Sequence, residues 1–254
     1  METISVKDLT ISYGDFVIMQ NISFTINKHD IFMIMGPSGC GKSTILKVLT
    51  GLKEPSSGDV IINGKNLWNS NNETKMDVML NSGVLYQSGA LFSSMTLQEN
   101  ITMPLQRYTK YSKKEIDELA SLKLALVGLT GFEDFYPSEI SGGMKKRAGL
   151  ARALALDPKI VYFDGPSAGL DPISSRLLDD LILEINQSLG TTIVIVSHEL
   201  NSIFSIANNS IFLDSDTKSI IGRGNPKELL KNSTNDKILN FLTRGGTNNE
   251  KNTK

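Results

Sequence analysis

The chain has 254 residues, 40% of them hydrophobic, which suits one globular unit with a sizeable core. Its 26 Lys and Arg against 27 Asp and Glu give a net charge of -1, so we expect no nucleic acid among its partners. No apolar run reaches the length of a membrane span, and the start METISVKDLT lacks the apolar stretch of a secretory signal. Because Cys40 is the single cysteine, an internal disulfide is excluded. These features predict a cytoplasmic protein.

The first forty residues predict strands at 4–13, 17–26 and 31–35, separated by turn-forming residues. The third strand, IFMIM, is short and wholly apolar, which is typical of a buried strand. A glycine-rich loop follows it, and residues 43–52 then have a helical pattern that ends at a glycine. The sequence therefore predicts a strand, a loop and a helix in series.

Further along, residues 112–129 predict a helix with one apolar face, formed by Ile116, Leu119, Leu122, Leu126 and Leu129. Residues 159–164 and 191–198 resemble central parallel strands, joined by a crossover helix at 174–189. The predicted fold class is α/β with a helical insertion. The polar tail at 243–254 is expected to be disordered.

The segment GPSGCGKST matches the phosphate-loop pattern of a Gly, four residues and then Gly-Lys-Ser. Its glycines let backbone N–H groups point into one concavity, and the helix that begins there adds partial positive charge. A glycine-rich turn without a ligand is the alternative, but the flanking buried strand and helix favour a triphosphate such as ATP. The predicted ATP-binding residues are Gly36, Pro37, Ser38, Gly39, Cys40, Gly41, Lys42, Ser43 and Thr44, with Lys42 reaching the β and γ phosphates.

A magnesium site is predicted beside this loop. The Ser43 hydroxyl is one expected Mg²⁺ ligand, and Asp164, at the end of the strand KIVYFD, is another. A strand-ending Asp is often only a turn residue, but the phosphate loop upstream favours the metal role.

Residues 140–154, ISGGMKKRAGLARAL, are followed by the strand that bears Asp164 and then by AGLDP, and together they resemble the motifs of ABC transporter ATPases. The resemblance extends from about residue 5 to 241. It implies a P-loop NTPase (RecA-like) ABC ATPase core with an antiparallel β subdomain and an inserted α-helical subdomain. The implied boundaries are 4–242 for the ATPase domain and about 95–158 for the helical insertion.

The same resemblance implies a homodimer that sandwiches ATP. Ser141, Gly142 and Gly143 would contact the γ-phosphate held by the opposite subunit, a contact suited to small residues at a helix N-terminus. Asp171 resembles the dimer-contact aspartate of the family.

Three further positions resemble nucleotide-site residues of the family. Tyr13 resembles the aromatic residue that stacks on adenine, although a strand residue packed on its neighbour is the alternative. Gln87 resembles the glutamine that touches magnesium and the attacking water. His198 resembles the histidine that grips the γ-phosphate, whereas a histidine at a strand end is otherwise usually structural.

One position departs from the family pattern. Gly165 follows Asp164 where these ATPases normally carry a Glu that polarises the hydrolytic water. A positioned general base contributes on the order of a hundred- to ten-thousand-fold in rate. The resemblance still implies ATP hydrolysis, at a rate that Gly165 leaves open, with Gln87 and His198 as possible helpers. The alternative is a nucleotide-sensing scaffold with little hydrolysis.

Residues 86–105, YQSGALFSSMTLQENITMPL, closely resemble ATPases of the Mla and Mce-type phospholipid transport systems, as do FYPSEISGGM, SAGLDPISS and the NFL near Phe241. The implied function is phospholipid trafficking for outer-membrane lipid asymmetry. The implied partners, at the cytoplasmic face of the inner membrane, are an integral MlaE-like permease, an Mce-domain lipid carrier and a STAS-domain regulator.

Two other assignments compete with phospholipid trafficking. SGGM also occurs in peptide and betaine importers, so a different ABC importer is an alternative. A soluble ABC ATPase of DNA repair or translation is another, but this chain has neither a long coiled-coil insertion nor a second cassette.

Overall fold

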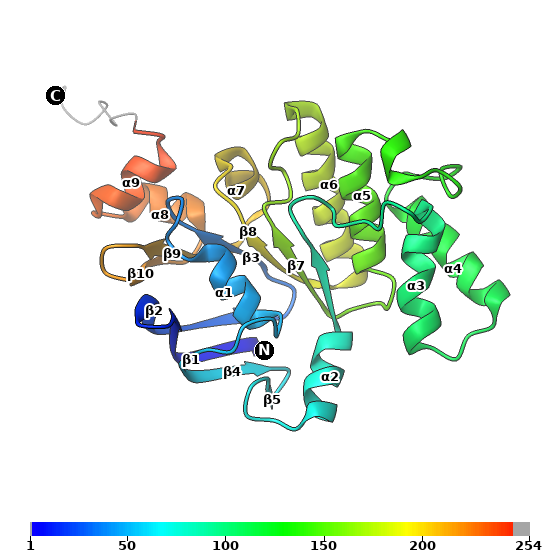
Figure 1. Ribbon diagram of the computed structural model, residues 1–254. Coiled ribbons are helices and arrows are strands. Elements are labelled where there is room, and N and C mark those ends of the chain that lie inside the picture. Colours follow the sequence, from blue (N-terminus) through cyan, green and yellow to red (C-terminus); the bar gives the residue numbers. More distant parts are fainter. Residues whose placement is uncertain (1, 246–254) are drawn as a thin grey trace.

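The computed structural model describes residues 2–245, which form two β-sheets and a set of helices (Figure 1). The antiparallel sheet has the strand order β2-β1-β4-β5, with β1 (Glu2–Tyr13), β2 (Phe16–Asn27), β4 (Ser57–Ile62) and β5 (Lys65–Asn66). The second sheet has the order β10-β9-β3-β8-β7-β6, with β3 (Ile31–Met35), β6 (Ser82–Leu85), β7 (Ile160–Asp164), β8 (Thr192–Val196), β9 (Asn209–Asp214) and β10 (Ser219–Arg223).

The central strands β3, β7 and β8 are apolar along their length because both faces of the second sheet are covered. Side chains alternate between the two faces. Phe32 and Ile34 pack with α1 (Lys42–Leu49) and the antiparallel sheet, whereas Met33 and Met35 belong to the core that the other helices share. Strands β6, β7, β8, β3 and β9 are parallel, so their carboxyl ends meet at one edge.

The remaining helices are α2 (Asn72–Leu80), α3 (Leu97–Tyr108), α4 (Lys113–Leu126), α5 (Gly142–Ala153), α6 (Pro172–Leu189), α7 (Leu200–Ile206), α8 (Pro226–Asn232) and α9 (Asp236–Leu242), with a 3-10 turn at Pro137–Glu139. Helices α3 and α4 lie together at the right of Figure 1, beyond α5. The predicted α/β fold with an antiparallel β-sheet and inserted helices is confirmed. The domain boundaries at 4–242 and 95–158 stay predictions.

The predicted apolar face of α4 is wrong at one residue. Leu122 is 61% exposed, and the buried face consists of Ile116, Ala120, Lys123 and Leu124. Lys123 is tolerated there because its ammonium forms an ion pair with Asp157.

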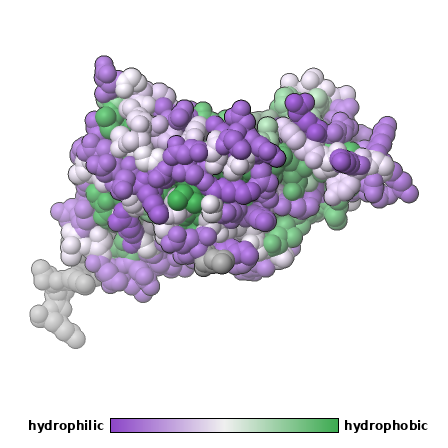
Figure 2. Space-filling model, turned by 90° about the horizontal axis from the view of Figure 1, so that it is seen from below, coloured by the Kyte–Doolittle hydropathy of each residue, from purple (hydrophilic) through white to green (hydrophobic). Residues whose placement is uncertain are grey.

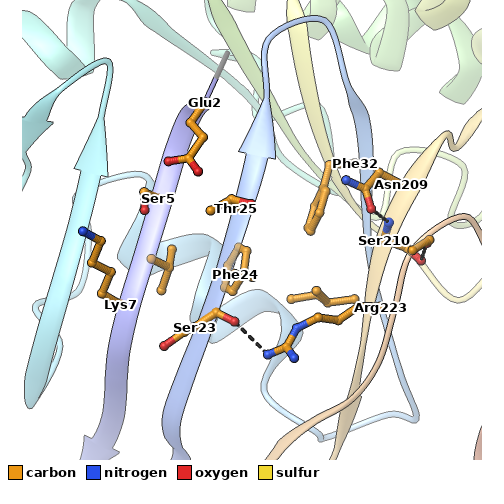
Figure 3. A pocket seen from close by; sticks show the side chains of 13 residues that line it. Glu2, Ser5, Lys7, Ser23, Phe24, Thr25, Phe32, Asn209, Ser210 and Arg223 are labelled. Atoms are coloured by element: carbon orange, nitrogen blue, oxygen red, sulfur yellow. Dashed lines mark hydrogen bonds between the residues drawn. The ribbon is translucent and has the colours of Figure 1, made fainter.

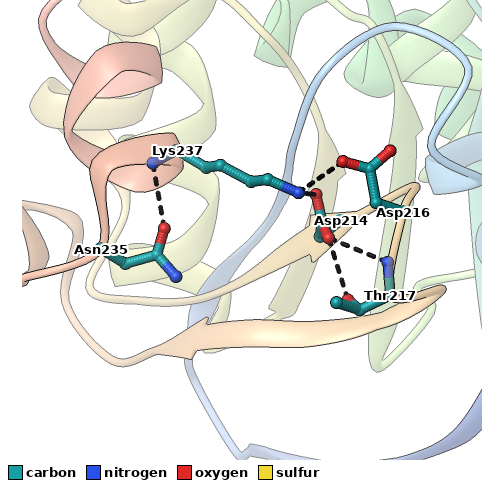
Figure 4. Close-up of polar contacts among 5 residues, drawn as sticks. All are labelled: Asp214, Asp216, Thr217, Asn235 and Lys237. Carbon is teal, nitrogen blue, oxygen red and sulfur yellow. Dashed lines mark hydrogen bonds and ion pairs between the residues drawn. The ribbon is translucent and has the colours of Figure 1, made fainter.

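Besides its apolar packing, helix α9 is joined to the end of β9 by the ion pairs of one lysine. Lys237 Nζ lies 2.7 Å from Oδ1 of Asp214 at the end of β9 and 2.6 Å from Oδ2 of Asp216 (Figure 4). Asp214 is buried, and the hydrogen bond from Lys237 holds its pKa below the usual range. Of the predicted disordered tail, residues 246–254 lie outside the described residues.

The underside of the molecule is mostly hydrophilic, and its apolar surface gathers toward the side that carries α3 and α4 (Figure 2). No helix within residues 2–245 combines the length and the apolar character that crossing a bilayer requires.

Candidate nucleotide site

The predicted phosphate loop connects β3 to α1 at the carboxyl edge of the parallel strands. Gly36 and Gly41 have φ values of 144° and 99°, a region that favours glycine. A Cβ on Gly36 would come within 2.6 Å of the Leu213 carbonyl oxygen, and one on Gly41 within 2.7 Å of Ile18 Cγ2. The loop therefore needs glycine at both positions.

The Lys42 ammonium lies inside this loop. Its Nζ donates to the carbonyls of Gly36 and Pro37, both at 2.8 Å. Burial lowers the pKa of Lys42, and the neighbouring Cys40 and Asp164 oppose that shift. A phosphate entering the loop would replace the two carbonyls as the partner of this ammonium.

The first turn of α1 offers further donors to an anion. Gly41 is its N-cap and provides no side-chain hydrogen bond, and the first amides of a helix have no intrahelical acceptor. Cys40 is buried, and burial raises the pKa of its thiol, so it stays a neutral packed group at pH 7. Backbone amides and Lys42 are thus the anion-binding groups of the loop.

Two of the three predicted magnesium ligands, Ser43 and Asp164, are in direct contact, and the third, Gln87, stays a prediction. Ser43 Oγ, at the start of α1, donates to Oδ1 of Asp164, at the end of β7, over 2.9 Å. A hydroxyl and a carboxylate are hard oxygen ligands of the kind that Mg²⁺ prefers. Residues 2–245 contain no group of three His, Cys, Asp or Glu side chains that could hold a metal. A magnesium ion here would therefore take its other ligands from phosphate, from water and from Gln87 if that prediction holds.

Gln87 lies beside Gly165. A Cβ on Gly165 would be 3.8 Å from Gln87 Cγ and 3.9 Å from Cδ, with Ala168 Cβ nearest at 3.6 Å. Gly165 has a φ of 57°, so a larger side chain has space there but a strained backbone. The position of the missing Glu therefore faces the glutamine that was predicted to orient water.

Lys146, on α5, is a site residue that the sequence analysis missed. It is 6% exposed, and its Nζ lies 3.4 Å from the Gly165 carbonyl oxygen. Burial lowers its pKa, and the charge of Asp164 opposes this. Its spacing from Gly149 and Leu150 places it on the buried face of α5, but the sequence alone gives no sign of its contact with Gly165. The site thus holds a second cation next to Asp164.

The glycines of the predicted ATP-contacting motif lie at the start of α5. Ser141 is the N-cap, and its Oγ accepts from the Met144 amide at 3.3 Å. A Cβ on Gly142 would meet nothing within 4 Å, whereas one on Gly143 would lie 3.2 Å from Ser174 Oγ. Contact with an opposite subunit stays a prediction.

Asp171 caps α6 within its own chain. It accepts from the amides of Ile173 and Ser174, both at 3.0 Å, and from the Ser174 hydroxyl at 2.6 Å. These hydrogen bonds, with that of the Ser174 hydroxyl the strongest, lower its pKa. The predicted dimer contact of Asp171 is untested by this geometry.

His198 follows β8, with a side chain that is 59% exposed and Nε2 3.7 Å from Glu199 Oε1. Tyr13, at the end of β1, is 50% exposed, and Lys53 Nζ lies 4.1 Å from its ring centroid. An adenine stacked on Tyr13 would have to use the face of the Tyr13 ring opposite Lys53 or displace Lys53. Their roles toward ATP remain predictions.

A separate cavity of about 640 Å³ lies between the two sheets (Figure 3). Phe24 and Phe32 line it, and Arg223 donates to the Ser23 carbonyl oxygen at 2.8 Å. Phe32 lies near the amino end of β3, opposite the end that leads into the phosphate loop. The cavity contains none of the predicted site residues, so it is not the nucleotide site.

Comparisons with known proteins agree with this site. A family model described as ABC transporter matches residues 19–168. "Intermembrane phospholipid transport system ATP-binding protein MlaF" of Haemophilus influenzae (strain ATCC 51907 / DSM 11121 / KW20 / Rd) is 38% identical over 94% of this chain and 89% of its own length. For the protein of the same name from Escherichia coli (strain K12), the values are 38%, 94% and 88%.

A second group of relatives has a different name. "Probable ribonucleotide transport ATP-binding protein mkl" of Mycobacterium tuberculosis (strain ATCC 25618 / H37Rv) is 42% identical over 94% of this chain. The match covers 66% of that relative, so the present chain spans about two thirds of its length.

Solved structures agree in fold. The ADP conformation of MJ1267, "an ATP-binding cassette of an ABC transporter", has a TM-score of 0.82 and 26% identity, covering 96% of this chain and 99% of that one. The dimeric post-hydrolysis state of the ATP-binding cassette MJ0796 bound to ADP and Pi has a TM-score of 0.79 and 27% identity, covering 87% and 98%. The chain therefore belongs to the ABC transporter family, among the cassettes that bind and hydrolyse ATP.

Proposed function

We propose that this chain energises an ABC transporter that moves phospholipids between membranes. The observation that carries the proposal is the 38% identity to the intermembrane phospholipid transport ATPases, over 94% of this chain and nearly 90% of theirs. The resemblance of residues 86–105 to the same ATPases supports it from within the sequence.

The nucleotide chemistry is proposed to rest on the phosphate loop and its neighbours. Lys42 and the loop amides bind the phosphates, while Ser43 and Asp164 would hold Mg²⁺, which neutralises charge on the phosphate oxygens. In this proposal, Gln87 and His198 orient the attacking water. The Lys146 ammonium, 3.4 Å from the Gly165 carbonyl oxygen, adds positive charge at the position of the missing Glu.

The transporter, in this proposal, holds two copies of the chain. Each copy presents Ser141, Gly142 and Gly143 to the phosphate loop of the other, and Asp171 contacts the partner. The dimeric arrangement of MJ0796 supports this, as does the open space around Gly142. ATP then closes the dimer because its γ-phosphate is contacted only in the closed form.

The membrane partner is proposed to be a permease of the MlaE type, docked on α3 and α4 at the cytoplasmic face of the inner membrane. The apolar surface toward these helices supports that site (Figure 2). An Mce-domain carrier and a STAS-domain regulator complete the proposed assembly. Closure of the ATPase dimer would move the permease helices.

Ribonucleotide transport is the second candidate, because the relative that bears that name is 42% identical. The deciding experiment reconstitutes the chain with its co-purifying permease in liposomes and follows fluorescent phospholipid and labelled ribonucleotide in parallel. ATP-dependent transfer of phospholipid alone supports the proposal. ATP-dependent uptake of ribonucleotide alone overturns it.

A further inference from the structure

A recess between α6 and α7 lies outside the nucleotide site. Its volume is about 470 Å³, within the range of about 300 to 1,000 Å³ that is usual for pockets that bind small molecules. Its walls come from the segment after β7, from α6, and from α7 with the residue that precedes it. The recess is therefore large enough for a small organic ligand.

The recess contains an unusual concentration of unpartnered polar atoms. Ser167 Oγ, Asp179 Oδ1 and Ser202 Oγ are buried without a hydrogen bond, and within residues 2–245 only the Tyr162 hydroxyl shares that condition. The three residues are 5%, 7% and 2% exposed. Because an unpaired buried polar group is costly, three of them around one cavity indicate that a bound group supplies the missing hydrogen bonds.

Charge decides what kind of group fits. The carboxylates of Asp179, Asp180 and Glu199 line the recess, and Arg176 is the one cation among its described lining residues. Burial raises the pKa of Asp179 to about 6, an effect that the Ser202 hydroxyl opposes and the charge of Asp180 reinforces. At pH 7.5 the carboxylate is therefore largely ionised, and its Oδ1 has no hydrogen bond. A cationic hydrogen-bond donor would both neutralise this charge and supply the missing hydrogen bond.

The rest of the lining distinguishes an organic cation from a metal ion. Leu170, Leu183 and Ile206 provide apolar wall, which suits a hydrocarbon chain. The described residues contain no trio of metal-binding side chains. We infer that this recess binds a protonated primary amine, whose ammonium donates to Asp179 and Ser202 and whose hydrocarbon part packs on Leu183 and Ile206.

The test titrates the full-length protein with n-butylammonium chloride by calorimetry at pH 7.5, with n-butanol as the neutral analogue and potassium chloride holding the ionic strength. We expect saturable binding of one butylammonium and none of butanol. Asp179→Asn and Ser202→Ala should weaken it about tenfold or more, the loss expected for one charge-assisted hydrogen bond. Glu184→Gln is the matched control, because Glu184 is an exposed carboxylate of α6 outside the recess.

Equal binding of butanol, an unchanged affinity in Asp179→Asn, or no saturation below about 10 mM overturns the inference. A circular dichroism spectrum of each variant confirms that it is folded. Repeating the titration on the permease complex separates the two sources of an ammonium group. Unchanged affinity there assigns the site to a free amine, and blocked binding assigns it to a lysine side chain of the partner.

Discussion

Replacing Gly165 with Glu places a carboxylate where this family usually has its general base. Such a base contributes on the order of a hundred- to ten-thousand-fold, or roughly 3 to 5 kcal/mol of barrier. A Glu side chain has room, since the nearest atom to a Cβ at 165, apart from its chain neighbours, would be Ala168 Cβ at 3.6 Å. The φ of 57° is unfavourable for a non-glycine residue, at a cost of roughly 1 to 2 kcal/mol.

That strain is present in both the ground state and the transition state, so it lowers the stability of the fold and leaves the barrier largely unchanged. Lys146, 3.4 Å from the Gly165 carbonyl oxygen, can pair with the new carboxylate and weaken it as a base. We therefore expect Gly165→Glu to raise ATP turnover about tenfold or more, a threshold set below the roughly hundredfold minimum for a general base because Lys146 weakens the new carboxylate. The melting temperature should fall.

The assay is phosphate release at saturating ATP by the protein in complex with its permease. Gly165→Gln is the matched control, because it has the same backbone strain and nearly the same size but no basic carboxylate. A Glu variant that is no faster than the Gln variant would refute the reasoning, and would show that Gln87, His198 or Lys146 already fulfils the role of the base.

Three further predictions concern the nucleotide loop and the recess. Lys42→Ala should weaken ATP binding by about tenfold to a hundredfold, because charge-assisted hydrogen bonds to the phosphates are lost. Equilibrium binding of a fluorescent ATP analogue measures this change. Lys47→Ala is the control, because Lys47 is an exposed lysine of the same helix. Ser43→Ala should raise the Mg²⁺ concentration for half-maximal ATP turnover by about tenfold, and an unchanged Mg²⁺ dependence would contradict the pairing of Ser43 with Asp164. Asp179→Asn should stabilise the protein by about 1 to 3 kcal/mol at pH 7.5. The folded-state pKa of Asp179 is raised to about 6. The wild type therefore gains stability as pH falls through 6 toward 4, and the stability advantage of the variant should disappear over that range. A difference in denaturant midpoint between the two proteins that is independent of pH would argue against this prediction.

The sequence was sufficient to predict the phosphate loop and its setting. The apolar strand before it, the glycines and the helix after it are all local signals, and the structure has β3, the loop and α1 in that order. The pairing of Ser43 with Asp164 was also predictable, because parallel strands bring their carboxyl ends to one edge of a sheet.

Buried charges were not predictable in the same way. Lys123 was not among the residues predicted for the buried face of α4, and it is buried there because Asp157, 34 residues further along the chain, neutralises it. Lys146 and Lys53 also have contacts, with the Gly165 carbonyl and the Tyr13 ring, that depend on distant segments. Hydrophobic periodicity reports which residues are apolar, and it does not identify a cation whose partner comes from elsewhere in the fold.

The central claim is that each ATP lies between the phosphate loop of one copy and the Ser141 helix tip of the other. Two permease-bound dimers test it, one with Lys42→Ala and Ser141→Arg in the same copy and one with the two changes in different copies, each isolated with two affinity tags. Our account predicts that the second dimer retains one intact site and occludes labelled ATP, whereas the first has no intact site and occludes none. The reverse result, with ATP retained only when both changes share a copy, would place each site within a single chain and contradict the account.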